Sequence, residues 1–214
     1  EDKVSFPAII AMDRSSGRSK FRIEAMDPLG ATHDLLLLTD EGIFYWIDFD
    51  SKNYFKLSSS WHGLPLEKLP ELLLGIAVLP EDGLVKRQSE DSLEISRERE
   101  GGLHTSLKLF ARWIDPGPRA VLSRAESEVE RKDHNFDAYR VDYSKFLDKA
   151  DFYLPEEVEL VGWQKIKSKE LPSLTERKYS LQFKISWRER KWNESLNSDM
   201  FSIPQFVKRE FKEI

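Results

Sequence analysis

Segment 20–76 constrains the fold more than any other part of this chain, because several apolar-rich segments follow one another there at short intervals. Residues Lys20–Met26 alternate between charged and apolar side chains, which is typical of a strand with one buried face. Residues 35–38 and 43–49 are mostly apolar at successive positions, which predicts strands covered on one face and lining an apolar space with the other. Turn residues separate these segments, so we expect an antiparallel meander.

A tight turn is expected between the first two strands of this meander. It has the sequence Asp27-Pro28-Leu29-Gly30, in which proline fixes one φ angle and glycine accepts a positive one. The backbone of such a turn largely fixes the direction of the side chain between Pro28 and Gly30. Leu29 is therefore predicted to point outward at the tip.

A short leucine-rich helix is expected directly after the meander, in residues 65–74. Leu66, Leu69 and Leu73 fall on one helical face, and Gly75 stands where a C-terminal cap would be. Pro70 lacks the N–H that a helix interior needs, so the helix either begins near this residue or bends there.

The second half of the chain reads as a run of longer strands. Segment 120–131 has the composition of a helix, but its small and apolar residues alternate with charged ones, and this favours a strand. A loop is expected in residues 78–86, and an early strand, 4–13, should form a hairpin with Lys20–Met26. The expected later strands are 92–99, 103–114, 120–131, 136–146, 157–167 and 179–187.

Composition narrows the possible functions. A chain of 214 residues with 40% hydrophobic residues suits one domain with its own core. The formal charge of −5, with both signs mixed, argues against a nucleic-acid partner, which would need a cationic surface. The chain contains no cysteine, which excludes disulfides, thiolate metal sites and cysteine nucleophiles.

No pattern of catalytic residues stands out, so we expect no enzymatic activity, no cofactor and no metal. The histidines are far apart in sequence and lack the spacing of metal ligands: His33, His62, His104 and His134. Segment 187–192 mixes tryptophan with basic residues, as single-strand nucleic-acid platforms do. Because the chain is acidic overall, an exposed strand end whose arginines are solvated is the better interpretation.

A set of residues in segment 20–76 gives the chain a resemblance to a known family. These residues are Arg22, Pro28, Leu29, Gly30, Thr32, Gly63, Leu64, Pro65, Leu66, Leu73, Leu74 and Gly75. Their order resembles the LolA/LolB superfamily of outer-membrane lipoprotein carriers and receptors, and most of all its LolB receptor branch. A weaker similarity to the superfamily lies in residues 154–158 and 199–204.

The resemblance implies a mainly β (α+β) fold, in which a curved antiparallel half-open barrel is closed on one face by short helices. Residues 1–214 would form a single domain of this kind, without the helix and strand that open the family's fold. Such a barrel would hold the acyl chains of lipoproteins in an apolar cavity. The expected cavity residues are Phe21, Ile23, Leu36, Leu38, Phe44, Trp46, Leu66, Leu69, Leu73, Leu107, Leu109, Phe183, Ile185 and Trp187.

The resemblance also implies a role for the turn formed by Pro28, Leu29 and Gly30. In the receptor branch, a leucine at the tip of a projecting loop promotes insertion of lipoproteins into the outer membrane. The expected partners are acylated lipoproteins or another lipid-like ligand, the inner leaflet of the outer membrane, and a periplasmic carrier. We expect a monomer at the periplasmic face of the outer membrane, held by an N-terminal lipid anchor that precedes Glu1 in the full-length protein.

Two alternatives stay open at this point. The apolar residues could simply fill a core, in which case the protein would be an envelope module for assembly or interaction. The chain could also carry a different apolar ligand, such as a lipid or a pigment.

Overall fold

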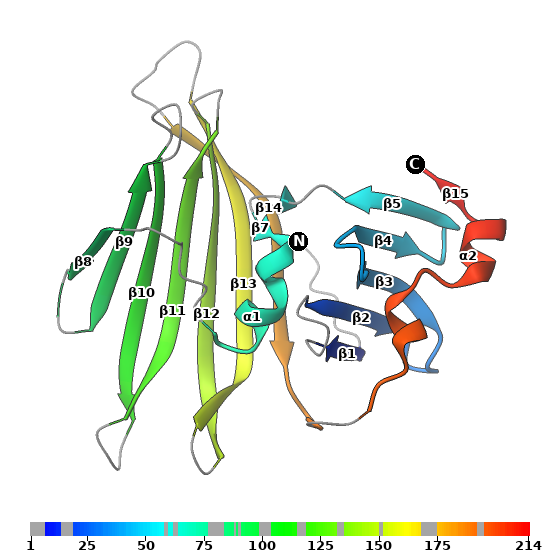
Figure 1. Cartoon of the computed structure of the whole chain (residues 1–214), viewed down its shortest axis with the longest axis horizontal. Helices are drawn as coiled ribbons and strands as arrows, with labels where there is room; N and C mark the ends of the chain where they lie inside the picture. Colours follow the sequence, from blue (N-terminus) through cyan, green and yellow to red (C-terminus); the bar gives the residue numbers. More distant parts are fainter. Residues whose placement is uncertain are drawn as a thin grey trace. The chain divides into compact units, whose positions relative to one another are not determined.

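A computed structural model gives the fold of this chain. Its described residues are mainly β-strands, with two short α-helices, α1 (Leu69–Leu73) and α2 (Gln205–Glu210) (Figure 1). The mainly β class expected from the sequence is therefore confirmed. The described residues are 7–13, 19–57, 60–61, 64–76, 84–87, 89, 91–98, 104–114, 119–131, 135–149, 152–167, 175–191 and 195–214.

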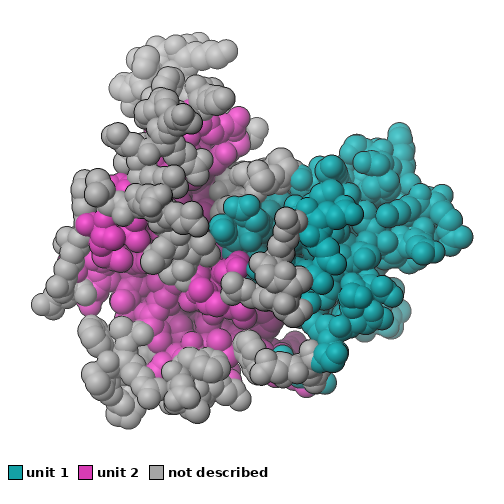
Figure 2. Space-filling view, in the orientation of Figure 1, with its two compact units in different colours: residues 1–61, 65–70, 191–214 teal, residues 62–64, 71–190 magenta. Residues whose placement is uncertain are grey.

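The chain divides into two compact units (Figure 2). Unit 1 consists of residues 1–61, 65–70 and 191–214, and unit 2 consists of residues 62–64 and 71–190. Each unit contains one large sheet. Two compact units can still unfold in one cooperative transition, so the expected single domain stays a prediction. The half-open barrel also stays a prediction, because the described strands form two large sheets and one two-stranded sheet and close no barrel.

The sheet of unit 1 is a meander completed by the end of the chain. Its strand order is β1-β2-β3-β4-β5-β15, and neighbours are antiparallel except that β15 runs parallel to β5. The expected hairpin and meander are both confirmed. The strands are β1 (Ala8–Asp13), β2 (Lys20–Met26), β3 (Thr32–Leu38), β4 (Phe44–Asp48), β5 (Asn53–Leu57) and β15 (Lys212–Glu213).

Apolar residues form two rows across one face of this sheet. Directly paired residues of antiparallel strands point to the same face, so the register decides which side chains are neighbours. Trp46 continues its row onto β5, where its ring stacks on Phe55 with the centroids 5.0 Å apart. The two rows are Phe21–Leu38–Phe44 and Ile23–Leu36–Trp46.

The opposite face of the same sheet is covered by the C-terminal segment. Leu35, Leu37 and Ile47 are fully buried there together with Val207 of α2. Apolar residues on both faces of β3 and β4 were expected, and this packing explains them on one face. Partly buried residues complete the cluster: Tyr45, Phe49, Tyr54, Ile203 and Phe211.

Polar residues of β2 hold the same C-terminal segment. Arg22 donates from Nη1 to the carbonyl oxygen of Met200, which lies in the 3-10 helix η2 (Ser198–Phe201), at 3.1 Å. The ammonium group of Lys20 lies 5.8 Å from the ring centroid of Phe201 and pairs with Asp40 at 2.9 Å. The charged face of β2 thus serves as an attachment surface for the C-terminal segment, and Lys20 is buried there.

The leucine-rich segment is helical over a shorter stretch than the sequence predicts. A 3-10 helix, η1 (Leu66–Lys68), precedes α1, and Pro70 is the second residue of α1. A helix tolerates proline in its first turn, so the helix begins beside Pro70 and does not bend there. Gly75 has a φ of +75°, as a glycine cap requires. Two short strands, β6 (Ser60–Trp61) and β7 (Leu64–Pro65), lie outside both large sheets.

The sheet of unit 2 is antiparallel throughout, in the order β14-β13-β12-β11-β10-β9-β8. Segment 119–130 is a strand, so alternation outweighed helix propensity there, as expected. The strands are β8 (Leu84–Arg87), β9 (Ser92–Glu98), β10 (His104–Ile114), β11 (Arg119–Glu130), β12 (Phe136–Lys149), β13 (Phe152–Lys167) and β14 (Thr175–Ser186).

Two neighbouring rows of paired residues in this second sheet differ in chemistry. One row of paired residues crosses it with apolar side chains, and the next row along the strands is mostly charged. The charged row neutralises itself, since Arg124 pairs with Asp142 and Arg140 reaches the same carboxylate at 2.7 Å. The rows are Leu109–Ala125–Val141–Leu160–Phe183 and Phe110–Arg124–Asp142–Glu159–Lys184.

Several expected boundaries were wrong. The predicted loop 78–86 ends in strand β8, whose residues 84–87 pair with β9, while residues 77–83 lie outside the described part of the chain. Strand β13 begins at Phe152, not at residue 157, and so includes Pro155. This proline is tolerated because it lies beyond the last β13–β14 pair, Glu157–Ser186, where no ladder bond is needed on that side. Strand β14 begins at Thr175, not at residue 179.

Truncation of a leucine under the C-terminal segment should destabilise unit 1 strongly. Leu37 is fully buried, so Leu37→Ala should lower the free energy of unfolding by about 2–5 kcal/mol. Leu29 is 94% exposed. The matched control Leu29→Ala should therefore change the free energy of unfolding by less than about 0.5 kcal/mol. Urea unfolding measures both values. Equal effects of the two substitutions would contradict the packing of α2 on this sheet.

Candidate functional site

The turn between β2 and β3 is rigid and presents a single apolar side chain. The carboxylate of Asp27 accepts hydrogen bonds from the backbone N–H groups of Leu29 and Ala31, both at 2.8 Å. Gly30 has a φ of +90° and donates its N–H to the Asp27 carbonyl oxygen at 3.0 Å. Leu29 is 94% exposed, so it points outward as the turn chemistry predicts.

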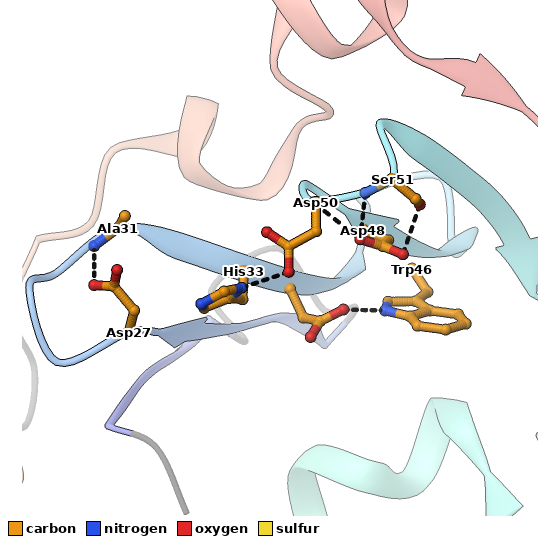
Figure 3. A network of polar contacts seen from close by, with 8 residues as sticks. Asp27, Ala31, His33, Trp46, Asp48, Asp50 and Ser51 are labelled. Atoms are coloured by element: carbon orange, nitrogen blue, oxygen red, sulfur yellow. Dashed lines mark hydrogen bonds and ion pairs between the residues drawn. The ribbon is translucent and has the colours of Figure 1, made fainter. Parts of the chain in front are cut away.

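A polar network occupies the same end of the sheet (Figure 3). The imidazole Nδ1 of His33 lies 2.7 Å from a carboxylate oxygen of Asp50. Asp48 accepts from the hydroxyl of Ser51 at 2.6 Å and from two backbone N–H groups at 3.0 Å. The neighbouring turn between β4 and β5 is thereby held as firmly as the leucine turn.

This network shifts the pKa values of His33 and Asp48 in opposite directions. The hydrogen bond to Asp50 and the charge of that carboxylate raise the pKa of His33, with smaller contributions from Asp27 and Asp34. The hydrogen bonds from Ser51 lower the pKa of Asp48. The end of the sheet near Leu29 therefore combines several carboxylates with one imidazole, that of His33.

The structure divides the expected cavity residues between the two sheets. Phe21, Ile23, Leu36, Leu38, Phe44 and Trp46 share one face of the unit 1 sheet. Leu107, Leu109, Phe183 and Ile185 share the apolar face of the unit 2 sheet. Leu66, Leu69 and Leu73 come from η1 and α1, and all three are fully buried. Trp187 directly follows β14.

A small pocket lies at the end of the unit 1 sheet where β3 finishes. Its volume is about 150 Å³, and two of the expected cavity residues, Leu38 and Phe44, line it. A cavity of roughly this size accommodates a molecule such as benzene. The other lining residues are Gly42, Ile43, Lys56, Leu57 and Glu67.

The pocket and the leucine turn lie at opposite ends of β3. The strand has seven residues, from Thr32 beside the turn to Leu38 at the pocket. With a rise of about 3.3 Å per residue, the two features are roughly 20 Å apart. They therefore form two separate sites and not one continuous groove.

Sequence reasoning missed several residues that shape these sites. Asp27 fixes the leucine turn by accepting a hydrogen bond from the backbone N–H of Leu29. An aspartate at the start of a turn commonly makes this bond to the residue two positions later, so the sequence did contain a signal for it. Segment 187–192 was expected to be an exposed strand end with solvated arginines. Arg188 is indeed exposed, but Arg190 is partly buried because it folds back over the ring of Trp187.

No helix in the described part of the chain is long and apolar enough to cross a membrane. Among the same residues, no three histidine, aspartate or glutamate side chains are placed to bind a metal ion together.

Comparisons of this chain with protein-family models, with characterised proteins and with solved structures found no match. The family resemblance expected from the sequence therefore stays a prediction.

The pairing of His33 with Asp50 should make stability pH-dependent. A raised folded-state pKa means that the contribution of this pair is fully present below about pH 6.5 and is lost as the pH rises through the raised value. NMR titration of the His33 ring should give a pKa above the ordinary value. Asp50→Asn should return it toward that value, whereas an unchanged titration in this variant would contradict the pairing.

Proposed function

We propose that this protein binds acyl chains of lipoproteins without catalysing a reaction, and that it acts at the periplasmic face of the outer membrane. Acylated lipoproteins would be its ligands, and the membrane would be the surface to which they are delivered. The half-open barrel and the N-terminal lipid anchor belong to the same proposal.

The single observation that carries this proposal is the exposure of Leu29 on a braced turn. A leucine with 94% of its surface in water gains free energy when it enters an apolar phase, about 1.5–3 kcal/mol for full burial. Because the bonds to Asp27 and the positive φ of Gly30 already fix the turn, little conformational entropy is lost on insertion. Shallow and reversible contact with lipid follows from these two features.

The pocket at the far end of β3 supports a role in acyl binding. Leu38, Phe44 and Leu57 supply apolar surface, and Lys56 adds a cation at the rim. The volume of about 150 Å³ suits the end of an acyl chain and is too small for a whole one. Each methylene that enters contributes about 0.8 kcal/mol, so binding would be weak and reversible.

A second candidate function is an interaction module whose core is filled. The observation that favours it is the complete burial of Phe21, Leu66 and Leu73 in the chain by itself. Side chains already shielded in this way leave no surface for an acyl chain at those positions. An assembly module of the envelope would need only the scaffold and an exposed contact such as Leu29.

Replacement of the exposed leucine should abolish membrane contact without affecting the fold. Leu29→Asp removes the apolar group and adds a charge that is costly to bury, so binding to phospholipid vesicles should weaken by tenfold or more. Delivery of a lipoprotein to such vesicles should fall with it. Val85 of unit 2 is 64% exposed. The matched control Val85→Asp should leave vesicle binding and lipoprotein delivery unchanged. Unaltered delivery by the Leu29→Asp variant would refute the role of the turn.

A fluorescent fatty-acyl probe separates the two candidate functions. On the acyl-binding proposal, the probe binds and Leu57→Trp weakens its binding several-fold, because the larger ring fills the pocket. Leu29→Asp should leave probe binding unchanged, since the turn and the pocket are separate sites. Absence of probe binding to the unmodified chain would instead favour the interaction module.

A further inference from the structure

Three buried N–H groups at the end of β14 have no hydrogen-bond acceptor among the residues that the structure describes. They are Nε and Nη1 of Arg190 and the indole Nε1 of Trp187. Buried donors are paired in nearly all native proteins, and an unpaired one calls for a specific explanation, such as a bound water or ion. The three donors lie on two contacting side chains, so the groups that would accept from them belong to one small region of the structure.

Contacts with neighbouring strand residues fix both side chains. The backbone N–H of Trp187 donates to the carbonyl oxygen of Glu156 at 2.8 Å, which extends the ladder between β13 and β14 by one bond. Arg190 folds back so that its guanidinium carbon lies 4.6 Å from the ring centroid of Trp187. Its Nη2 donates to the carbonyl oxygen of Pro155. The guanidinium is therefore held by a ring and a carbonyl, and its remaining donors are positioned in advance.

The charge of this guanidinium lacks a close counter-ion. No carboxylate among the described residues forms an ion pair with Arg190. Burial lowers the pKa of Arg190, and the charge of Glu156 opposes this shift without a hydrogen bond between the two groups. A guanidinium taken out of water is normally matched by an anion that also accepts its hydrogen bonds. The local chemistry thus consists of donors and positive charge.

We propose that Arg190 and Trp187 form an oxyanion-binding site that takes a carboxylate or a phosphate group. Each of the two open edges of a planar guanidinium presents two parallel N–H groups that match the oxygen spacing of both anions. Nη2 carries two N–H groups, so after its bond to Pro155 one edge, shared with Nε or with Nη1, still offers such a pair. The indole N–H of Trp187 is a further unpaired donor on the contacting ring. The anion could be free in solution or could be the phosphate of a lipid headgroup. This site is independent of the acyl-binding proposal, since it lies in unit 2 and uses neither Leu29 nor the pocket.

Titration of the full chain with sodium phosphate tests the site, with sodium chloride at equal ionic strength as the reference. The expected result is a saturable change in tryptophan fluorescence together with a rise in Tm. Arg190→Met should lose both responses. Trp187→Phe keeps a ring under the guanidinium and removes one donor, so its phosphate affinity should fall about tenfold. Arg188 is exposed in the same segment, and Arg188→Met is the control that should respond like the unmodified chain.

Further arms of the experiment identify the source of the anion. Sodium acetate in place of phosphate tests a carboxylate ligand. Phosphatidylcholine vesicles with and without phosphatidylglycerol test a headgroup, and binding that requires both phosphatidylglycerol and Arg190 would assign one. If Arg190→Met does not fold, Arg190→Lys replaces it in the test. This variant keeps the charge but lacks the planar guanidinium with its parallel N–H groups, so it should still bind phosphate more weakly.

Three results would overturn the site. One is the absence of a saturable response to every anion and vesicle tested. Another is an equal response of the unmodified chain and the Arg190 variants. The third is a response that appears only in Glu156→Gln, because Glu156 would then be the internal acceptor of these donors in solution.

Discussion

The sheet of unit 1 depends on a cover that the chain supplies from its far end. Leu35, Leu37 and Ile47 point to one face of β3 and β4, where Val207, Ile203 and Phe211 of the C-terminal segment help to bury them. An antiparallel sheet can leave one face solvated only if that face is polar, and this one is apolar. The bond from Arg22 to Met200 and the short parallel strand β15 fasten the cover at two places.

The β2–β3 turn and the end of β14 differ in which kind of group lacks a partner. At the β2–β3 turn, the carboxylates of Asp27, Asp34 and Asp48 accept hydrogen bonds from the chain itself, and the unsatisfied surface is the side chain of Leu29. At the end of β14, the apolar ring of Trp187 is covered by Arg190, and the unsatisfied groups are N–H donors. The first end suits contact with an apolar phase, and the second suits an anion.

Much of the local structure could be predicted because side-chain alternation and turn chemistry act within a few residues. The alternation in Lys20–Met26 placed Phe21 and Ile23 on the correct common face, and Pro28 with Gly30 predicted the outward direction of Leu29. The start of β13 was missed because Pro155 resembles a boundary, whereas its position beyond the end of β14 makes it harmless.

By itself, the sequence determined the strand-rich class, the leucine turn and the absence of thiol chemistry, since each follows from residue type and short-range spacing. Only the tertiary structure decided that most strands form two large sheets, that the C-terminal segment covers one of them, and that Arg190 is partly buried against Trp187. These outcomes depend on contacts between residues far apart in the chain. Such contacts are set by register and by competition for apolar surface, and no short pattern in the sequence records them.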